Sequence, residues 1–193
     1  METKYLLFIT FSFTPLNASG TMRTSAFAKY LSEFGWIPIV VSPDWNEQNC
    51  QPSSIYDPTL VDDSNCHVYR VEYHVPKEEK FNSIRSKVLR WFGDNWLYRD
   101  MYESMETQCE KVVKEFPVKA ILTSGSSNPK FIYALSSKLQ KKFGLPWIVD
   151  HRDIPDQEDH YSESSLKNRM FIKASSWITA RYTRNASLIT TVS

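Results

Sequence analysis

Short apolar runs of strand length alternate along this chain with segments whose apolar positions recur every three or four residues. The run at residues 4–10 is nearly continuous in apolar side chains, as is typical of a strand covered on both faces. Similar runs predict five further strands, at residues 36–42, 68–73, 118–123, 147–150 and 187–192. Residues 44–65 are polar and contain proline, so we expect a loop there.

The segments between these runs predict helices. Met22, Ala26, Tyr30 and Phe34 repeat at four-residue spacing, which marks one face of a helix that Gly35 is placed to end. Further helical patterns are predicted at residues 84–92, 94–116, 131–143 and 166–182. Strands that alternate with helices in this way predict an α/β, Rossmann-like parallel sheet with helices on both faces.

Ligands of such sheets bind at the carboxyl ends of the strands, near the point where the strand order reverses. The loops to inspect therefore begin at Phe11, Ser42, Thr123 and Asp150. At 193 residues the chain is expected to form one domain, residues 1–193.

Composition removes several classes of function. Lys plus Arg number 23 and Asp plus Glu 22, so the net charge of +1 gives no indication of nucleic acid as a partner. Three widely spaced cysteines favour neither a disulfide framework nor a zinc site, and they point to a reducing, cytoplasmic setting. No metal is predicted, and no run reaches the ~20 apolar residues that span a bilayer.

The loop after the first strand holds the first candidate site. Ser19 and Gly20 stand where a strand meets a helix N-terminus, a place suited to an anion, and Arg23 follows in the first helical turn. A glycine needed only for a turn is the alternative. The dinucleotide fingerprint GxGxxG is absent, which argues against a nicotinamide or flavin cofactor.

Two further loops carry polar residues at strand ends. Ser124, Gly125 and Ser126 follow the fourth strand, where they would either cap the next helix or bind a sugar or phosphate. After the fifth strand, Asp150, His151, Arg152 and Asp153 form a run of four ionisable groups. Such a run indicates either a functional site or a structural Asp–Arg pair.

The segment 85–99 mixes arginines and a lysine with tryptophan, phenylalanine and tyrosine. A basic and aromatic helix of this kind can rest on an anionic membrane surface. Its apolar residues can equally form the core stripe of a helix that covers the sheet.

Taken together, these segments resemble the N-terminal domain of bacterial family 4 glycosyltransferases over nearly the whole chain. The resemblance is carried by the loop with Ser19-Gly20 and Arg23, by the segment 92–96 and by the closing strand at 188–193. The strongest match is the run Lys142-Phe143-Gly144-Leu145-Pro146-Trp147-Ile148-Val149-Asp150-His151-Arg152-Asp153. Two departures are Gly93, where the family has proline, and Ile154-Pro155, where the family has tryptophan soon after the Arg-Asp pair.

The resemblance implies one half of a GT-B fold: an acceptor-side domain that faces a donor-binding C-terminal domain across a cleft. The implied activity is retaining transfer of a hexosyl-type sugar from a nucleotide-diphosphate sugar to a glycan or lipid-linked acceptor, without a cofactor. The implied setting is cell-envelope or exopolysaccharide biosynthesis, in the cytoplasm or at the inner face of the membrane.

The resemblance also assigns roles to residues. Ser19, Gly20, Arg23, Ser124, Gly125, Ser126 and Asp150 are expected to bind substrate. His151, Arg152 and Asp153 are expected to act in catalysis, with Asp153 orienting the acceptor hydroxyl.

Since the paired-glutamate motif of the C-terminal domain is absent from this chain, we expect the chain alone to be inactive and a longer product to exist. One alternative is a standalone, non-catalytic acceptor-binding module that needs a separate C-terminal subunit. An unrelated Rossmann-like binder of a small nucleotide is another.

Overall fold

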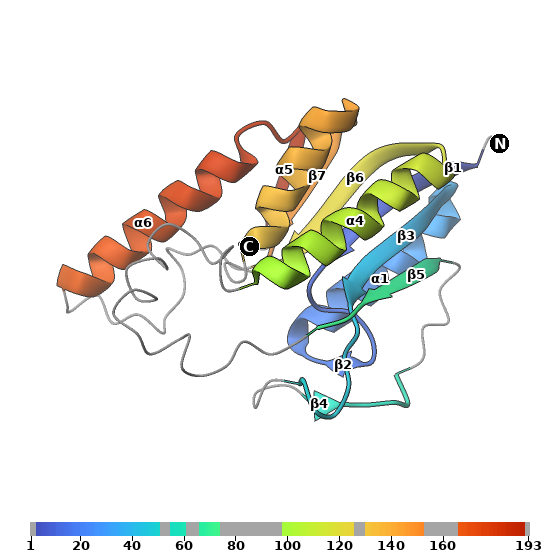
Figure 1. Cartoon of the computed structure of the whole chain (residues 1–193), viewed down its shortest axis with the longest axis horizontal. Helices are drawn as coiled ribbons and strands as arrows, with labels where there is room; N and C mark the ends of the chain where they lie inside the picture. Colours follow the sequence, from blue (N-terminus) through green and yellow to red (C-terminus); the bar gives the residue numbers. More distant parts are fainter. Residues whose placement is uncertain are drawn as a thin grey trace.

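Six parallel strands form the centre of the molecule (Figure 1). The computed structural model describes residues 3–50, 55–60, 66–73, 98–125, 130–152 and 166–191. In the order in which they lie side by side, the strands are β5 (His67–Val71), β3 (Trp36–Pro43), β1 (Lys4–Thr10), β6 (Val118–Gly125), β7 (Trp147–His151) and β8 (Leu188–Thr191). The predicted α/β, Rossmann-like fold class is confirmed.

The strand order reverses at the centre of the sheet. The chain first builds outward from β1 through β3 to β5, and then returns to the other side of β1 to build β6, β7 and β8. This is the doubly wound arrangement in which a crevice opens beyond the carboxyl ends of the two central strands. Here those strands are β1 and β6, so the loops that follow them are positioned to form a site.

Helices cover both faces of the sheet (Figure 1). One face carries α4 (Arg99–Glu115), α5 (Phe131–Phe143) and α6 (Leu166–Thr183), and the other carries α1 (Ser19–Leu31). Side chains of β1 alternate between them: Leu7 and Ile9 pack in the cluster of α4 and α5, and Leu6 and Phe8 in the cluster of α1. Fully burying such a side chain stabilises the fold by about 1.5–3 kcal/mol.

Helix α1 exists as predicted, but the apolar face read from its sequence points to solvent. Met22 is 70% exposed and Tyr30 51%, and Phe34, in the 3-10 turn η1 (Ser32–Phe34), is 76% exposed. The buried side of α1 consists of small residues, including Gly20 and Ala28, which let the helix lie close to the sheet. Gly35 ends this helical segment with a φ of 77°, as predicted.

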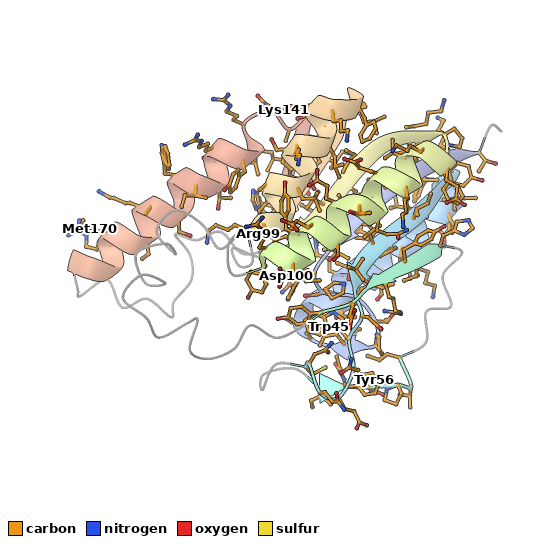
Figure 2. All side chains as sticks on the ribbon, in the orientation of Figure 1. Trp45, Tyr56, Arg99, Asp100, Lys141 and Met170 are labelled. Atoms are coloured by element: carbon orange, nitrogen blue, oxygen red, sulfur yellow. The ribbon has the colours of Figure 1, made fainter. Side chains whose placement is uncertain are left out.

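The predicted loop at residues 44–65 is confirmed for most of the part of that segment that the structure describes, but it contains a buried aromatic residue and a two-residue strand. Trp45 (Figure 2) is 2% exposed. Its indole N–H donates to the carbonyl of Phe11 at 3.0 Å. A short strand, β4 (Ile55–Tyr56), pairs antiparallel with β2 (Leu16–Asn17). Strands of two residues have no periodicity in the sequence, so they could not be predicted.

Some predicted elements lie outside the described residues. These are the helix at 84–92, the first residues of the helix at 94–116 and most of the basic and aromatic segment 85–99. The two alternatives for that segment, a membrane-surface contact and a core stripe, therefore both stay predictions. Among the described residues, no helix is both long and apolar enough to cross a bilayer.

Candidate functional site

A buried carboxylate, Asp150, lies near the carboxyl end of β7 and contacts both neighbouring strands, β6 and β8. In the strand register, Asp150 stands opposite Ser124 of β6 on one side and Thr190 of β8 on the other. Ser124 Oγ donates to Asp150 Oδ2 at 2.8 Å, and Thr190 Oγ1 donates to Asp150 Oδ1 at 2.9 Å. Parallel pairing alone thus brings two hydroxyl donors to the carboxylate.

The charge of Asp150 is balanced by Arg23, which comes from α1. Arg23 Nε donates to Asp150 Oδ2 at 2.8 Å, and Arg23 Nη2 donates to Asp150 Oδ1 at 2.6 Å. Two parallel N–H···O bonds of this kind fix both the distance and the plane of the guanidinium. Together with the two hydroxyls, they give the carboxylate four hydrogen bonds, about as many as its lone pairs accept.

The Arg23–Asp150 pair has one buried and one accessible end. The Asp150 side chain is 1% exposed, and that of Arg23 is 34% exposed. Neither bond to Asp150 uses Nη1 of Arg23. The structure therefore holds a guanidinium in a fixed orientation beside the carboxyl edge of the sheet, with part of its surface open to solvent.

This environment sets the protonation of Asp150. Burial by itself raises the pKa of the carboxyl group, but the hydrogen bonds from Arg23, Ser124 and Thr190 and the positive charge of Arg23 outweigh it. The pKa of Asp150 therefore lies below its usual value, and the group is charged at neutral pH. The same contact raises the pKa of Arg23.

A second arginine, Arg152, lies over the beginning of α1. Arg152 Nη2 donates to Ser19 Oγ at 3.2 Å, and its backbone N–H donates to the carbonyl of Gly125 at 3.0 Å. A Cβ placed on Gly20 would fall 1.7 Å from Arg152 Nη1. Gly20 thus leaves room for the guanidinium of Arg152 in this position, which is a more specific role than a turn.

His151 occupies a more enclosed position than Arg152. Its ring packs on that of Tyr133 with the centroids 4.9 Å apart, and 9% of the residue is exposed. Burial lowers the pKa of His151, although the charge of Asp150 opposes the shift. The imidazole is therefore neutral at pH 7.

Most of the residues predicted for the site converge at this edge of the sheet. Ser19, Gly20, Arg23, Ser124, Gly125, Asp150, His151 and Arg152 come from α1, β6, β7 and the residue after β7. Asp153 and Ser126 lie outside the described residues, so their predicted roles stay predictions. Arg23 lies in the second turn of α1 instead of the first, because the helix begins earlier, at Ser19.

One residue of this cluster was not predicted. Thr190 was part of a predicted strand, and nothing in its local sequence indicates that its hydroxyl reaches Asp150. The signal that could have found it is the register of parallel strands, which places the last polar residues of neighbouring strands side by side.

Two solved structures have folds similar to that of this chain. A UGT transferase from Siraitia grosvenorii, solved in complex with UDP, matches 97% of this chain and 44% of its own with a TM-score of 0.52 and 11% identity. MurG from Acinetobacter baumannii matches over 98% of this chain and 41% of its own, with a TM-score of 0.48 and 13% identity. No protein-family model and no curated protein matches the sequence.

The chain thus has the α/β, Rossmann-like fold of one half of a GT-B glycosyltransferase. It spans less than half the length of both solved proteins. At 11% identity to the Siraitia protein, the likeness shows the fold alone, and the further assignment to family 4 stays a prediction.

Proposed function

We propose that this chain is the acceptor-side half of a retaining glycosyltransferase. It would move a hexosyl-type sugar from a nucleotide-diphosphate sugar to a glycan or lipid-linked acceptor in cell-envelope or exopolysaccharide biosynthesis. The fold shared with glycosyltransferases supports this proposal. The observation that carries it is Arg23, a partly exposed guanidinium held by the buried Asp150 at the carboxyl edge of the sheet.

In this proposal Arg23 stabilises the departing diphosphate. Negative charge builds on that group as the bond to the sugar breaks, and a cation fixed beforehand stabilises it without having to reorganise. The start of α1 adds the positive end of a helix dipole at the same edge, and its first residue is preceded by Ala18, which has no polar side chain to cap it.

Asp150 then acts through Arg23 instead of touching the sugar. Its oxygens already accept four hydrogen bonds, from Arg23, Ser124 and Thr190. We therefore propose it as a positioning residue. Arg152, which lies beside Ser19, would be the second cation for the donor or the acceptor.

The decisive experiment measures sugar transfer by the native gene product from its own cells. Radiolabelled UDP-, GDP- and dTDP-hexoses are offered as donors, with the membrane and glycan fractions of those cells as acceptors. Arg23→Lys keeps the charge but loses the two-pronged bond to Asp150. We expect kcat for this variant to fall about 10²–10³-fold, the usual cost of losing one oriented donor.

Arg99→Lys is the matched control, because Arg99 is an exposed arginine on α4 that pairs with Glu103 in the same helix. It should transfer at the wild-type rate. Full activity of Arg23→Lys, or no transfer from any of the donors, would sink the proposal.

The alternative, a non-catalytic acceptor-binding subunit, draws on the finding that this chain spans less than half of the solved glycosyltransferases. The intact mass of the native product separates the two. A mass about twice the 22.5 kDa of this chain favours a two-domain enzyme. A mass near 22.5 kDa, together with a co-purified nucleotide-sugar-binding chain, favours the separate subunit.

A further inference from the structure

A hollow of the surface lies between α5 and α6, with a volume of about 700 Å³. The two helices line it with residues at the same spacing of three, four and seven positions. These residues are Ala134, Ser137, Lys138 and Lys141 on α5 and Trp177, Ala180, Arg181 and Arg184 on and just after α6. The small residues keep the helices from filling the space between them, so a groove remains, and we call it the α5–α6 groove.

This groove is remote from the carboxyl-edge site. It runs along α5 from Ala134 to Lys141 and along the end of α6, next to the turn that leads into β8. There Gln140 Nε2 donates to the carbonyl of Asn185, and Ser187 N–H donates to the carbonyl of Trp147, the first residue of β7. The groove therefore adjoins the amino ends of the strands, whereas Asp150 lies near the carboxyl end of β7.

The lysines of α5 differ in whether an acidic side chain pairs with them. On the side of α4, Lys138 pairs with Glu106 at 2.5 Å, and Lys142 pairs with Glu110. Lys141 points out at the upper edge of the molecule (Figure 2) and makes no ion pair with any residue that the structure describes. Acidic side chains of α4 thus offset the charge of Lys138, which also lines the groove, and that of Lys142. On α5, Lys141 is then the cation of the groove whose charge no described acidic residue offsets.

Helix α6 contributes positive charge without any negative charge. Its eighteen residues include Lys167, Arg169, Lys173 and Arg181 but no aspartate or glutamate, and Arg184 follows one residue after it. The whole chain has a net charge of only +1. Arg181 and Arg184 therefore bring positive charge to the groove with no acidic residue on the same helix, and such charge attracts anions.

Trp177 adds a flat apolar surface beside these cations. Its indole is exposed, and the guanidinium of Arg181 lies over the ring at 5.4 Å. Arginine forms two-pronged bonds with phosphate, and lysine binds it as a point charge. Pockets for small organic ligands commonly measure 300–1,000 Å³, a range that includes this groove.

We propose that the α5–α6 groove is a second binding site, which takes the phosphate groups of an organic anion. Arg181, Arg184 and Lys141 bind the phosphates, and Trp177 covers the uncharged part of the ligand. The phosphate can belong to a soluble phosphate ester or to a lipid headgroup. The two sources share this chemistry, and the experiment separates them.

The test is calorimetric titration of the full chain with inorganic tripolyphosphate at low and high salt. In the variant Lys141→Gln/Arg181→Gln/Arg184→Gln, we expect the affinity to fall about tenfold or more, since hydrogen bonds to charged groups contribute most to such binding. Its matched control, Arg99→Gln/Lys111→Gln/Lys114→Gln, removes the same charge from the exposed face of α4 and should bind as the wild type does.

A further variant tests the groove without changing its charge. Ala180 lines the groove and is exposed, so Ala180→Trp fills part of the groove with a large side chain. We expect this variant to bind tripolyphosphate more weakly while its thermal unfolding temperature stays unchanged. Arg23→Lys distinguishes this site from the proposed donor site, because groove binding should persist in it. Loss of tripolyphosphate binding in Arg23→Lys but not in the groove variants would overturn the inference and leave the proposed function standing.

Vesicles and a peptide complete the test. Sedimentation with phosphatidylcholine vesicles, with and without phosphatidylglycerol, shows whether a lipid headgroup serves as the phosphate source. Binding to either tripolyphosphate or the phosphatidylglycerol vesicles, lost in the groove variants, supports the inference. No binding to either overturns it, as does equal or tighter binding of an oligoglutamate peptide, because the groove would then select negative charge and not phosphate.

Discussion

At the scale of single residues, the structure keeps two neighbours at the end of β7 in different charge states. Asp150 is buried with four hydrogen-bond donors and is kept charged, while His151 is buried against an aromatic ring and is kept neutral. A charged group inside a protein is stable only when partners replace its lost water, and Asp150 has such partners. His151 has instead a ring contact that suits a neutral imidazole.

The partners of Asp150 lead to a prediction about stability. Asp150→Asn keeps the shape of the side chain but brings an NH₂ group where donors already point, so Arg23 loses its counter-charge. We expect the free energy of unfolding in urea to fall by about 2 kcal/mol, below the 3–5 kcal/mol of fully buried pairs because Arg23 is partly exposed. Glu103→Gln, which breaks the exposed pair with Arg99, should cost less than about 1 kcal/mol. Equal losses would contradict the structural role of Asp150.

His151 leads to a prediction about pH. Because its pKa is lowered in the folded protein, the unfolded chain takes up a proton below its usual value of 6.5 that the folded chain refuses. The contribution of His151 to stability should therefore be level well above pH 6.5 and fall as the pH drops through that value. Urea unfolding at pH 7.5 and pH 5.5 should show a smaller loss for His151→Gln than for the wild type. The control His67→Gln, at an exposed position, should keep the full loss.

The sequence predicts part of this cluster but not the pairing between its residues. The run Asp150–Asp153 indicates either a functional site or a structural Asp–Arg pair, and it contains one arginine, Arg152. The structure pairs Asp150 with Arg23, 127 positions away. Local spacing carries no information about such a pair, since it depends on where α1 crosses the end of β7.

At the scale of elements, strands were predicted well and helix faces less well. The central strands β1 and β3 are nearly continuous apolar runs, a pattern that is typical of strands covered on both faces. A helix can carry apolar residues on a side that faces solvent, as α1 does. The fully buried positions of α1 are glycine, threonine and alanine, and Phe27 and Leu31 pack on the sheet beside them. The four-residue spacing of the larger side chains did not indicate this face.

The orientation of α1 predicts how its residues tolerate change. Met22→Gln and Tyr30→Gln replace exposed side chains, so each should alter the free energy of unfolding by less than about 0.5 kcal/mol. Ala28→Met adds volume at a position with no exposed surface, and we expect a loss of about 1–3 kcal/mol. The reverse order in urea denaturation would show that α1 lies with its other face on the sheet.

At the scale of the whole molecule, the strand order determines where chemistry can occur. Alternation of strands and helices predicted a parallel sheet, but the order of its strands did not follow from the sequence, because any βα unit can in principle add to either edge. The reversal between β1 and β6 brings together residues from opposite ends of the chain, Arg23 and Thr190. This convergence is what makes the carboxyl edge a candidate for the donor site.

The same order leaves β8 at an edge of the sheet, with Leu188 53% and Ile189 47% exposed. An edge strand with apolar side chains is a template for pairing with a second chain. We therefore expect the isolated chain to self-associate as its concentration rises, in light scattering coupled to gel filtration. Ile189→Lys should increase the monomer fraction, because lysine on an edge opposes pairing.

Met22→Lys adds the same charge at an exposed apolar residue of α1, away from any strand edge. If both variants suppress association equally, net charge is responsible; suppression by Ile189→Lys alone assigns association to the β8 edge.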